Sequence, residues 1–145
     1  MTADGGRIAY VHTGFWPSPS PSTVFVTGTA WGLGRHTPAL FIVRNGSPEA
    51  TEQVFRKLSG RELPEAVSFC RLDDGTSPHQ HTAFYLEAFR VLRRMAQAKT
   101  LSAVITRSIG FLPWLALFRL RFGILVHSGK VDVAAFYKEW LADLR

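Results

Sequence analysis

Pairs of polar side chains that can bind ligands follow each of five short apolar segments. They are His12 and Thr13, Arg44 and Asn45, Asp73 and Asp74, Arg107 and Ser108, and His127 and Ser128. Arginine matches the geometry of phosphate oxygens, and a neutral imidazole can accept a proton from a hydroxyl group. If the five segments are parallel strands, these residues lie at one edge of a sheet. They therefore indicate a phosphorylated or hydroxyl-rich ligand, although polar strand ends are also common without one.

Short apolar segments that alternate with longer helical patterns predict such a sheet. The expected strands are Ile8–Val11, Ala39–Val43, Val67–Arg71, Ala103–Thr106 and Ile124–His127. The expected helices run over about 23–33, 48–58, 82–98, 112–122 and 133–144. These units predict an α/β, Rossmann-like three-layer domain with a mainly parallel sheet of about five strands.

Capping residues predict where two of these helices begin or end. Ser47 is a preferred N-cap, and Pro48 after it suits a first helical position. Gly34 and Gly60 follow the first two helices, where glycine favours the left-handed conformation that ends many helices.

The helix over 82–98 has an apolar face and a basic face. The apolar face, expected in the core, consists of Phe84, Ala88, Val91, Leu92 and Met95. The opposite face carries Glu87, Arg90, Arg93 and Arg94. The arginines are typical of a solvated helix face, and binding of lipid head groups or nucleic acid is the alternative interpretation.

Length and charge limit the classes of function. The 145 residues, 46% of them hydrophobic, suffice for one domain with its own core. The formal net charge of +6 favours anionic partners, but no nucleic-acid-binding motif accompanies it, so nucleic acid is not an expected partner. The single cysteine, Cys70, excludes an internal disulfide and a four-thiolate zinc site, and it is expected in the core.

The segment Gly14–Ser22 follows the first strand, where dinucleotide-binding folds hold a phosphate. It lacks both G-x-G-x-x-G and the P-loop lysine, so no nucleotide cofactor is expected. Pro17, Pro19 and Pro21 exclude regular structure here. The segment is interpreted either as a rigid lip over the site, with Trp16 as a stacking surface, or as a proline-stiffened connection.

A metal site is not expected. His79 and His81 lie near Asp73 and Asp74 in the sequence, but two histidines at this spacing on a loop are a weak signal. A solvated loop is the favoured interpretation.

The most hydrophobic stretch is Ile109–Val126. Arg119 and Arg121 lie inside it and Pro113 interrupts it, which excludes a membrane-spanning helix. Its apolar residues beside two arginines are typical of a helix on a membrane surface, which gives a secondary hypothesis of peripheral contact at the inner membrane face. These residues are Phe111, Trp114, Leu115, Phe118 and Phe122. The short polar start Met1–Gly6 does not resemble a secretory signal, so a cytoplasmic location is expected.

Four segments resemble a known family in their order and spacing. They are R-I-A-Y-V-H-T-G (Arg7–Gly14), F-I-V-R-N-G (Phe41–Gly46), A-V-I-T-R (Ala103–Arg107) and G-I-L-V-H-S (Gly123–Ser128). Over nearly the whole chain, the sequence resembles the N-terminal half of a GT-B glycosyltransferase, closest to glycosyltransferase family 4.

The resemblance implies a function. In that family two Rossmann-like lobes face a cleft, where the N-terminal lobe binds the acceptor and the C-terminal lobe binds the sugar nucleotide. On this analogy residues 1–145 form a single acceptor-binding lobe of an enzyme that transfers a sugar from a nucleotide-sugar donor. His127 would be catalytic and lie close to the transferring sugar. The substrate-binding residues would be His12, Gly14, Trp16, Arg44, Asn45, Asp73, Arg107 and Ser128.

The sequence departs from the family in two respects. Its first loop reads Gly14-Phe15-Trp16, without the glycine pair that approaches the donor diphosphate. The donor lobe and its paired glutamates are absent from the 145 residues, so transfer is expected only with a missing or separate C-terminal lobe. The lobe alone is therefore expected to be inactive, and a lipid-linked acceptor is a further hypothesis.

A non-catalytic α/β binding or scaffolding module is the competing interpretation, because such a domain keeps the same core without catalysis. A small enzyme that uses His12 or His127 alone as general base is least supported. No nucleophile, metal or cofactor motif accompanies either histidine.

Overall fold

Five parallel strands form the centre of the domain. The computed structural model describes residues 6–73, 81–117 and 122–124. In chain order the elements are β1 (Arg7–Trp16), α1 (Pro21–Gly34), β2 (Ala39–Asn45), α2 (Thr51–Ser59), β3 (Val67–Leu72), α3 (Thr82–Gln97), β4 (Leu101–Thr106), a short 3-10 helix (Ile109–Phe111), α4 (Leu112–Leu117) and β5 (Phe122–Ile124). The strand order is β3-β2-β1-β4-β5, and every neighbouring pair is parallel.

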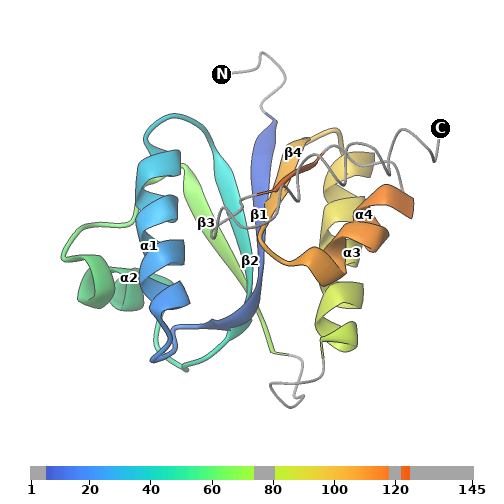
Figure 1. Cartoon of the computed structure of the whole chain (residues 1–145). Helices are drawn as coiled ribbons and strands as arrows, with labels where there is room; N and C mark the ends of the chain where they lie inside the picture. The colour runs from blue at the N-terminus through green and yellow to red at the C-terminus, as the bar shows by residue number, and fades with distance from the viewer. Residues whose placement is uncertain (1–5, 74–80, 118–121, 125–145) are drawn as a thin grey trace.

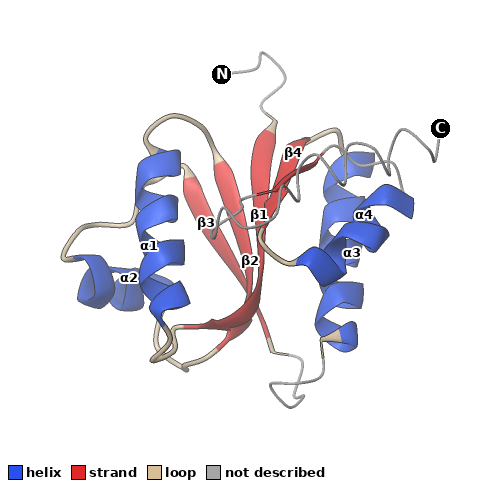
Figure 2. Cartoon of the chain, in the orientation of Figure 1, coloured by secondary structure: helices blue, strands red, loops and turns tan. Residues whose placement is uncertain are grey.

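Helices cover both faces of the sheet (Figures 1 and 2). α1 and α2 lie on one face, and α3 and α4 lie on the other. β1 leads into α1, whereas its neighbour β4 leads into α4 on the opposite face. The predicted Rossmann-like three-layer domain is thus confirmed, and its switch point, where the chain leaves toward opposite faces, lies between β1 and β4.

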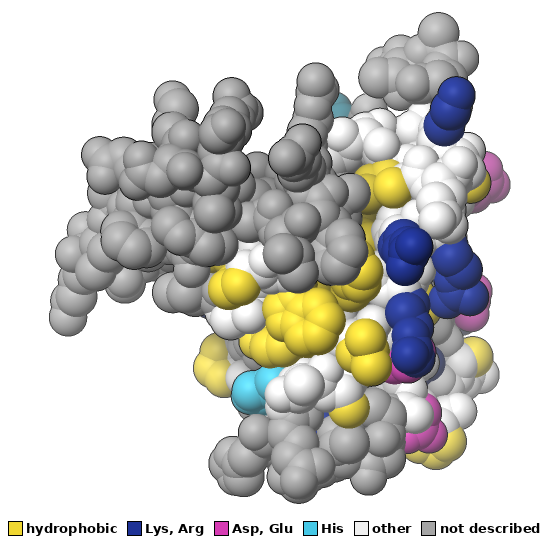
Figure 3. Space-filling view, turned by 90° about the vertical axis from the view of Figure 1, so that its right-hand side faces the viewer, with side chains coloured by type: hydrophobic (Ala, Val, Ile, Leu, Met, Phe, Trp, Pro, Cys, Tyr) yellow, Lys and Arg dark blue, Asp and Glu magenta, His cyan; other side chains and the backbone are white. Residues whose placement is uncertain are grey.

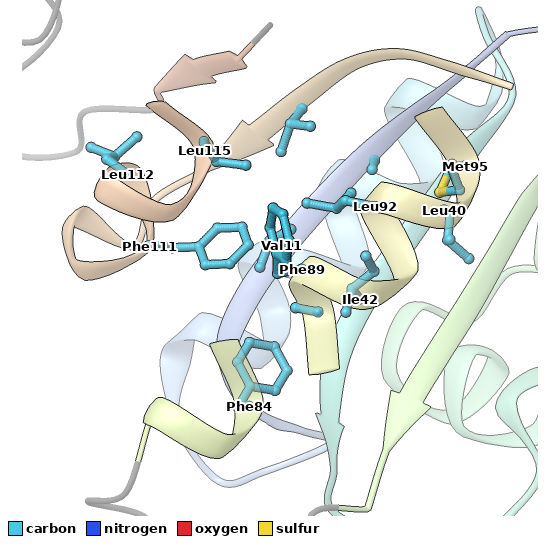
Figure 4. Packing of buried hydrophobic residues seen from close by; sticks show 13 residues of the cluster. Val11, Leu40, Ile42, Phe84, Phe89, Leu92, Met95, Phe111, Leu112 and Leu115 are labelled. Carbon is cyan, nitrogen blue, oxygen red and sulfur yellow. The ribbon is translucent and has the colours of Figure 1, made fainter. Parts of the chain in front are cut away.

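Two apolar clusters join the sheet to its helices. Between the sheet and α3, Val11 and Ile42 pack against Phe84, Phe89 and Leu92, as Figure 4 shows. The second cluster lies between the sheet and α1 with α2, and it includes Tyr10, Trp16, Val26, Phe41 and Phe55. Successive residues of β1 therefore serve opposite faces of the sheet, as the two-residue period of a strand requires.

β1 is longer than the sequence predicted. Its register with β2 shifts after Val11, but pairing resumes with Phe15 opposite Arg44 and continues to Trp16. The expectation of irregular structure directly after Gly14 was therefore wrong. The prolines that forbid strand pairing begin only at position 17. They therefore do not prevent β1 from continuing to Trp16.

The first turn of α2 also differs from the prediction. Its N-cap is Ala50 and not Ser47, and the helix begins at Thr51. The hydroxyl of Ser47 instead accepts a hydrogen bond from the Glu49 backbone N–H at 3.1 Å, which closes a turn before the helix. At the other end Gly60 has φ of 69°, which confirms the predicted left-handed cap.

Gly34 does not act as a left-handed cap, because Arg35 ends α1 in the right-handed region with φ of −76°. A Cβ at Gly34 would lie 2.3 Å from Cγ2 of Val67 and 3.0 Å from Cβ of Pro64. Glycine is needed here because α1 ends against the start of β3 with no room for a side chain.

The end of the described chain departs from the expected elements. β5 covers Phe122–Ile124, so Phe122 is not helical, and Gly123 pairs with Ile105 where a turn was predicted. β5 runs in register with β4, which places this glycine inside the ladder. The expected helix over 133–144 lies outside the described residues.

The apolar residues around α4 are used in the core. Phe111 and Leu115 are completely buried, and Trp114 packs against the same cluster. The expectation that Phe111 and Leu115 face a membrane was therefore wrong, and Phe118 lies outside the described residues. Among the described helices, none has the length and apolar character needed to cross a bilayer.

The buried face of α3 contains Phe89 in addition to four of its predicted members, whereas Val91 is only partly buried. We expect Leu92→Ala to lower the free energy of unfolding by about 2–5 kcal/mol, because it leaves a cavity beneath α3. Leu86→Ala is the matched control, since Leu86 is 37% exposed on the same helix. Urea unfolding of both variants is the measurement, and equal losses would contradict the assigned packing.

Candidate ligand-binding site at the switch point

Hydroxyl groups join the carboxyl ends of β1 and β4. Thr106 pairs with Val11 in the sheet, and its Oγ1 donates a hydrogen bond to the Val11 carbonyl at 3.0 Å. The same oxygen accepts a hydrogen bond from the Ser108 backbone N–H at 3.0 Å. Two residues further along from Val11 and from Thr106, Thr13 Oγ1 and Ser108 Oγ lie 3.0 Å apart. These hydrogen bonds therefore fix the ends of β1 and β4 relative to one another at the switch point.

His12 lies at this junction, inside the segment of β1 where the register shifts. Its side chain is only 8% exposed, and its Nε2 has no hydrogen-bond partner in the described part of the chain. A Cβ at Gly14 would lie 2.6 Å from this nitrogen. Because Gly14 has no side chain, the His12 imidazole can pack against the backbone of β1 at this position.

Arg107 brings a positive charge to the same place. Its guanidinium carbon lies 4.5 Å from the centre of the Phe25 ring on α1, and the side chain is partly buried. The ion pairs within the described segments involve Arg56, Lys57 and Arg90. Arg107 has no carboxylate partner among the described residues.

Tyr10 completes the group from within the sheet. It is completely buried, and its hydroxyl lies near Arg107, but the geometry gives it no hydrogen-bond partner among the described residues. We call Tyr10, His12, Phe25 and Arg107 the switch-point cluster. It contains one cation, two neutral hydrogen-bonding side chains and an aromatic ring.

Burial and charge fix the protonation states in this cluster. Burial, assisted by the charge of Arg107, lowers the pKa of His12 to about 4, so the imidazole is neutral at pH 7. Burial raises the pKa of Tyr10 to about 12, although Arg107 opposes this rise. The cluster thus offers neutral imidazole and phenol groups beside a guanidinium, which suits an anionic or hydroxyl-rich ligand.

Two other predicted site residues are buried, one at the end of β1 and one near the end of β2. Trp16 is completely buried, its ring is stacked on Phe69 at 4.1 Å, and its Nε1 donates to Thr27 Oγ1 at 3.0 Å. The expectation that Trp16 offers an open stacking surface was wrong, because the extended β1 carries it into the core. Arg44 is 1% exposed, with its guanidinium 4.5 Å from the Phe15 ring centre.

The remaining predicted residues are not part of the cluster. Asn45 follows Arg44, and its Oδ1 accepts a hydrogen bond from the Ser47 backbone N–H at 3.4 Å. Asp73 is exposed after β3, and β2 lies between β3 and β1. His127 and Ser128 lie outside the described residues. Of the predicted substrate-binding residues, the structure therefore brings together His12, Gly14 and Arg107.

Tyr10 and Phe25 were missed in the sequence. Tyr10 lies two residues before His12, and a strand of period two predicts both on one face. The same two-residue spacing relates Ile105 on β4 to Arg107 just after it. In both strands the sequence therefore indicated which residues share a face of the sheet. Nothing in the sequence singles out Phe25, because its role depends on where α1 crosses the sheet.

The solvent-facing side of α3 carries less specific chemistry. α3 presents Arg90, Arg93 and Arg94 to solvent, and Figure 3 shows basic side chains beside apolar ones on this side of the molecule. Arg90 pairs with Glu87 one turn away, as on an ordinary solvated helix. Within the described ranges, no three His, Cys, Asp or Glu side chains come together as metal ligands, and His79 lies outside them.

Cys70 is partly buried against the core, and burial raises the pKa of its thiol. Its place in β3 agrees with the predicted structural role.

Comparison with known proteins adds no family assignment: no protein-family model matches the chain, and no curated protein shows significant similarity to it.

The buried histidine makes stability depend on pH. Between about pH 4 and 6.5 the unfolded chain binds a proton at His12 that the folded chain does not, so stability rises with pH in this window. We expect this residue to contribute a loss of about 3 kcal/mol between pH 7 and pH 4. His12→Gln should remove that part of the pH dependence, and His36→Gln, at an exposed histidine, should not. Urea unfolding across this pH range is the measurement, and identical pH profiles for all three proteins would contradict the burial of His12.

The contact between Gly14 and His12 can be tested by a double-mutant cycle. Gly14→Ala should destabilise the fold by about 1–3 kcal/mol, because its Cβ overlaps the imidazole. In a His12→Ala background the same change should cost much less. Chemical unfolding of the four proteins measures the coupling, and additive effects would show that the two residues do not touch.

Proposed function

We propose that this domain is the acceptor-binding lobe of a family 4-like GT-B glycosyltransferase, and that the acceptor binds at the switch-point cluster. The observation that carries the proposal is the pairing of a buried, unpartnered His12 Nε2 with a partly buried Arg107 that has no acidic partner among the described residues. Open α/β sheets bind ligands in the crevice outside the strand ends at such a switch point. The resemblance of the segments around these two residues to the family supports the same assignment.

The chemistry of the cluster suits acceptor binding better than bond cleavage. Neutral His12 can exchange hydrogen bonds with a sugar hydroxyl, and Thr13 and Ser108 have hydrogen-bonded hydroxyl groups at the ends of the same two strands. Sugar transfer from a nucleotide requires stabilisation of the leaving diphosphate. We assign that task to a donor-binding lobe, so this lobe orients the acceptor and has no transferase activity alone.

A non-catalytic binding module would use the same cluster, and the ligand distinguishes the two functions. An acceptor lobe should bind sugars and should not bind sugar nucleotides on its own. A module without a role in sugar transfer should bind neither.

Thermal unfolding against a ligand panel tests the proposal. The panel contains hexoses, hexose phosphates and the common sugar nucleotides, each at matched ionic strength. We expect at least one sugar or sugar phosphate to raise Tm, because ligand binding to the folded state stabilises it. His12→Ala should abolish the shift, whereas Arg93→Ala on the exposed face of α3 should preserve it.

Stabilisation by sugar nucleotides alone would mean that the domain is not the acceptor side of the cleft. No response to any sugar from a folded sample would favour the non-catalytic module.

A further inference from the structure

Arg107 differs from Arg71, another arginine near a strand end, in the groups that accept hydrogen bonds from its guanidinium. Arg71, on β3, donates from Nη2 to the Ser47 carbonyl at 2.7 Å and also from Nη1 to the Glu49 carbonyl. Among the described residues Arg107 makes no hydrogen bond to a carbonyl or carboxylate, and its guanidinium lies over the Phe25 ring and near the Tyr10 hydroxyl. A structural arginine normally donates to such acceptors, as both Nη groups of Arg71 do although its Nε has no partner in the described chain. Arg107 has no comparable acceptor among the described residues.

In its contact with Phe25, Arg107 keeps guanidinium N–H groups that bond no carbonyl or carboxylate among the described residues. A guanidinium that stacks on a ring presents its face to the π system, while its N–H groups point outward in its own plane. Side-chain entropy is lost in this contact and the charge is partly removed from water. The position is therefore prepared to bind an oxygen anion, and an arginine fork matches two oxygens of one phosphate group.

The neighbours of Arg107 have the hydrogen-bonding character that an anion site needs. His12 is neutral and more than nine-tenths buried with a free Nε2, and the buried Tyr10 hydroxyl also lacks a partner among the described residues. The Thr13 and Ser108 hydroxyl groups, at the ends of the same two strands, are hydrogen-bonded to one another. No carboxylate of the described chain belongs to the cluster, so none of the described acidic residues repels a negative ligand there or competes with it for Arg107.

We infer that the switch-point cluster binds a phosphate group, with Arg107 as the charged partner and His12 and Tyr10 as neutral hydrogen-bond partners. On the proposed function, on which this step rests, the acceptor is a phosphorylated sugar. The phosphate site itself is a property of the cluster and holds for free phosphate as well.

Titration with inorganic phosphate, followed through the side-chain NMR signals of His12, tests the site in the unaltered protein. Phosphate beside the imidazole favours its protonated form, so binding should raise the pKa of His12 from about 4 toward its ordinary value. Ionic strength is held constant with NaCl, because exposed charges are screened by salt. An unchanged pKa of His12 at saturating phosphate would overturn the inference.

Variants of Arg107 test whether this residue supplies the positive charge that binds phosphate. Arg107→Gln should weaken phosphate binding by about tenfold or more, and Arg107→Lys should weaken it less because the charge remains without the fork. Arg93→Gln is the matched control and should change the affinity by less than about twofold, as expected for a solvated arginine. Circular dichroism verifies that each variant is folded. Equal affinity of Arg107→Gln and the unaltered protein would overturn the inference.

A comparison of a hexose 6-phosphate with the same hexose separates this inference from the proposed function. Tighter binding of the phosphorylated sugar, lost in Arg107→Gln, supports both. Equal binding of the two sugars overturns the phosphate inference and leaves the acceptor lobe standing. Binding of inorganic phosphate at His12 without binding of either sugar supports the phosphate site and contradicts the acceptor lobe.

Discussion

The hydrogen bond from Thr106 Oγ1 to the Val11 carbonyl holds together the two strands on which the candidate site depends. β1 and β4 are neighbours in the sheet, but after them the chain leaves toward opposite faces. Without a tie between their ends, the separation of His12 and Arg107 would vary with the loops that follow. Thr106 is completely buried and also accepts the Ser108 N–H, so one hydroxyl fixes both the strand pair and the start of the next connection.

The same junction contains groups that are costly for stability. The His12 Nε2 and the Tyr10 hydroxyl are buried without partners among the described residues, and each such group costs about 1–3 kcal/mol. A positive charge beside them adds to the cost of protonating His12. The two apolar clusters on either side of the sheet support this arrangement. Unsatisfied polar groups on an otherwise well-packed sheet are typical of sites where a ligand supplies the missing partners.

The layers of the fold were predictable, because short apolar segments and one strongly amphipathic helix determine them. Errors arose where tertiary contacts override local signals. Gly34 resembles a cap in sequence but is required by its contact with Val67, and Ser47 closes a turn instead of capping α2. His12 and Arg107 were identifiable as strand-end residues. Trp16 was misassigned because β1 regains its pairing after the irregular segment, and no local pattern in Gly14–Ser22 reveals that pairing.

The ends of β1 and β4 are thus proposed to form one binding site for a phosphorylated, hydroxyl-rich ligand. The decisive measurement is a crystal structure of the domain grown with a hexose 6-phosphate. We expect the phosphate within hydrogen-bonding distance of the Arg107 guanidinium, with a phosphate or sugar oxygen on Nε2 of His12. A sugar phosphate bound elsewhere, for example on the basic face of α3, with the switch-point cluster unchanged, would contradict it.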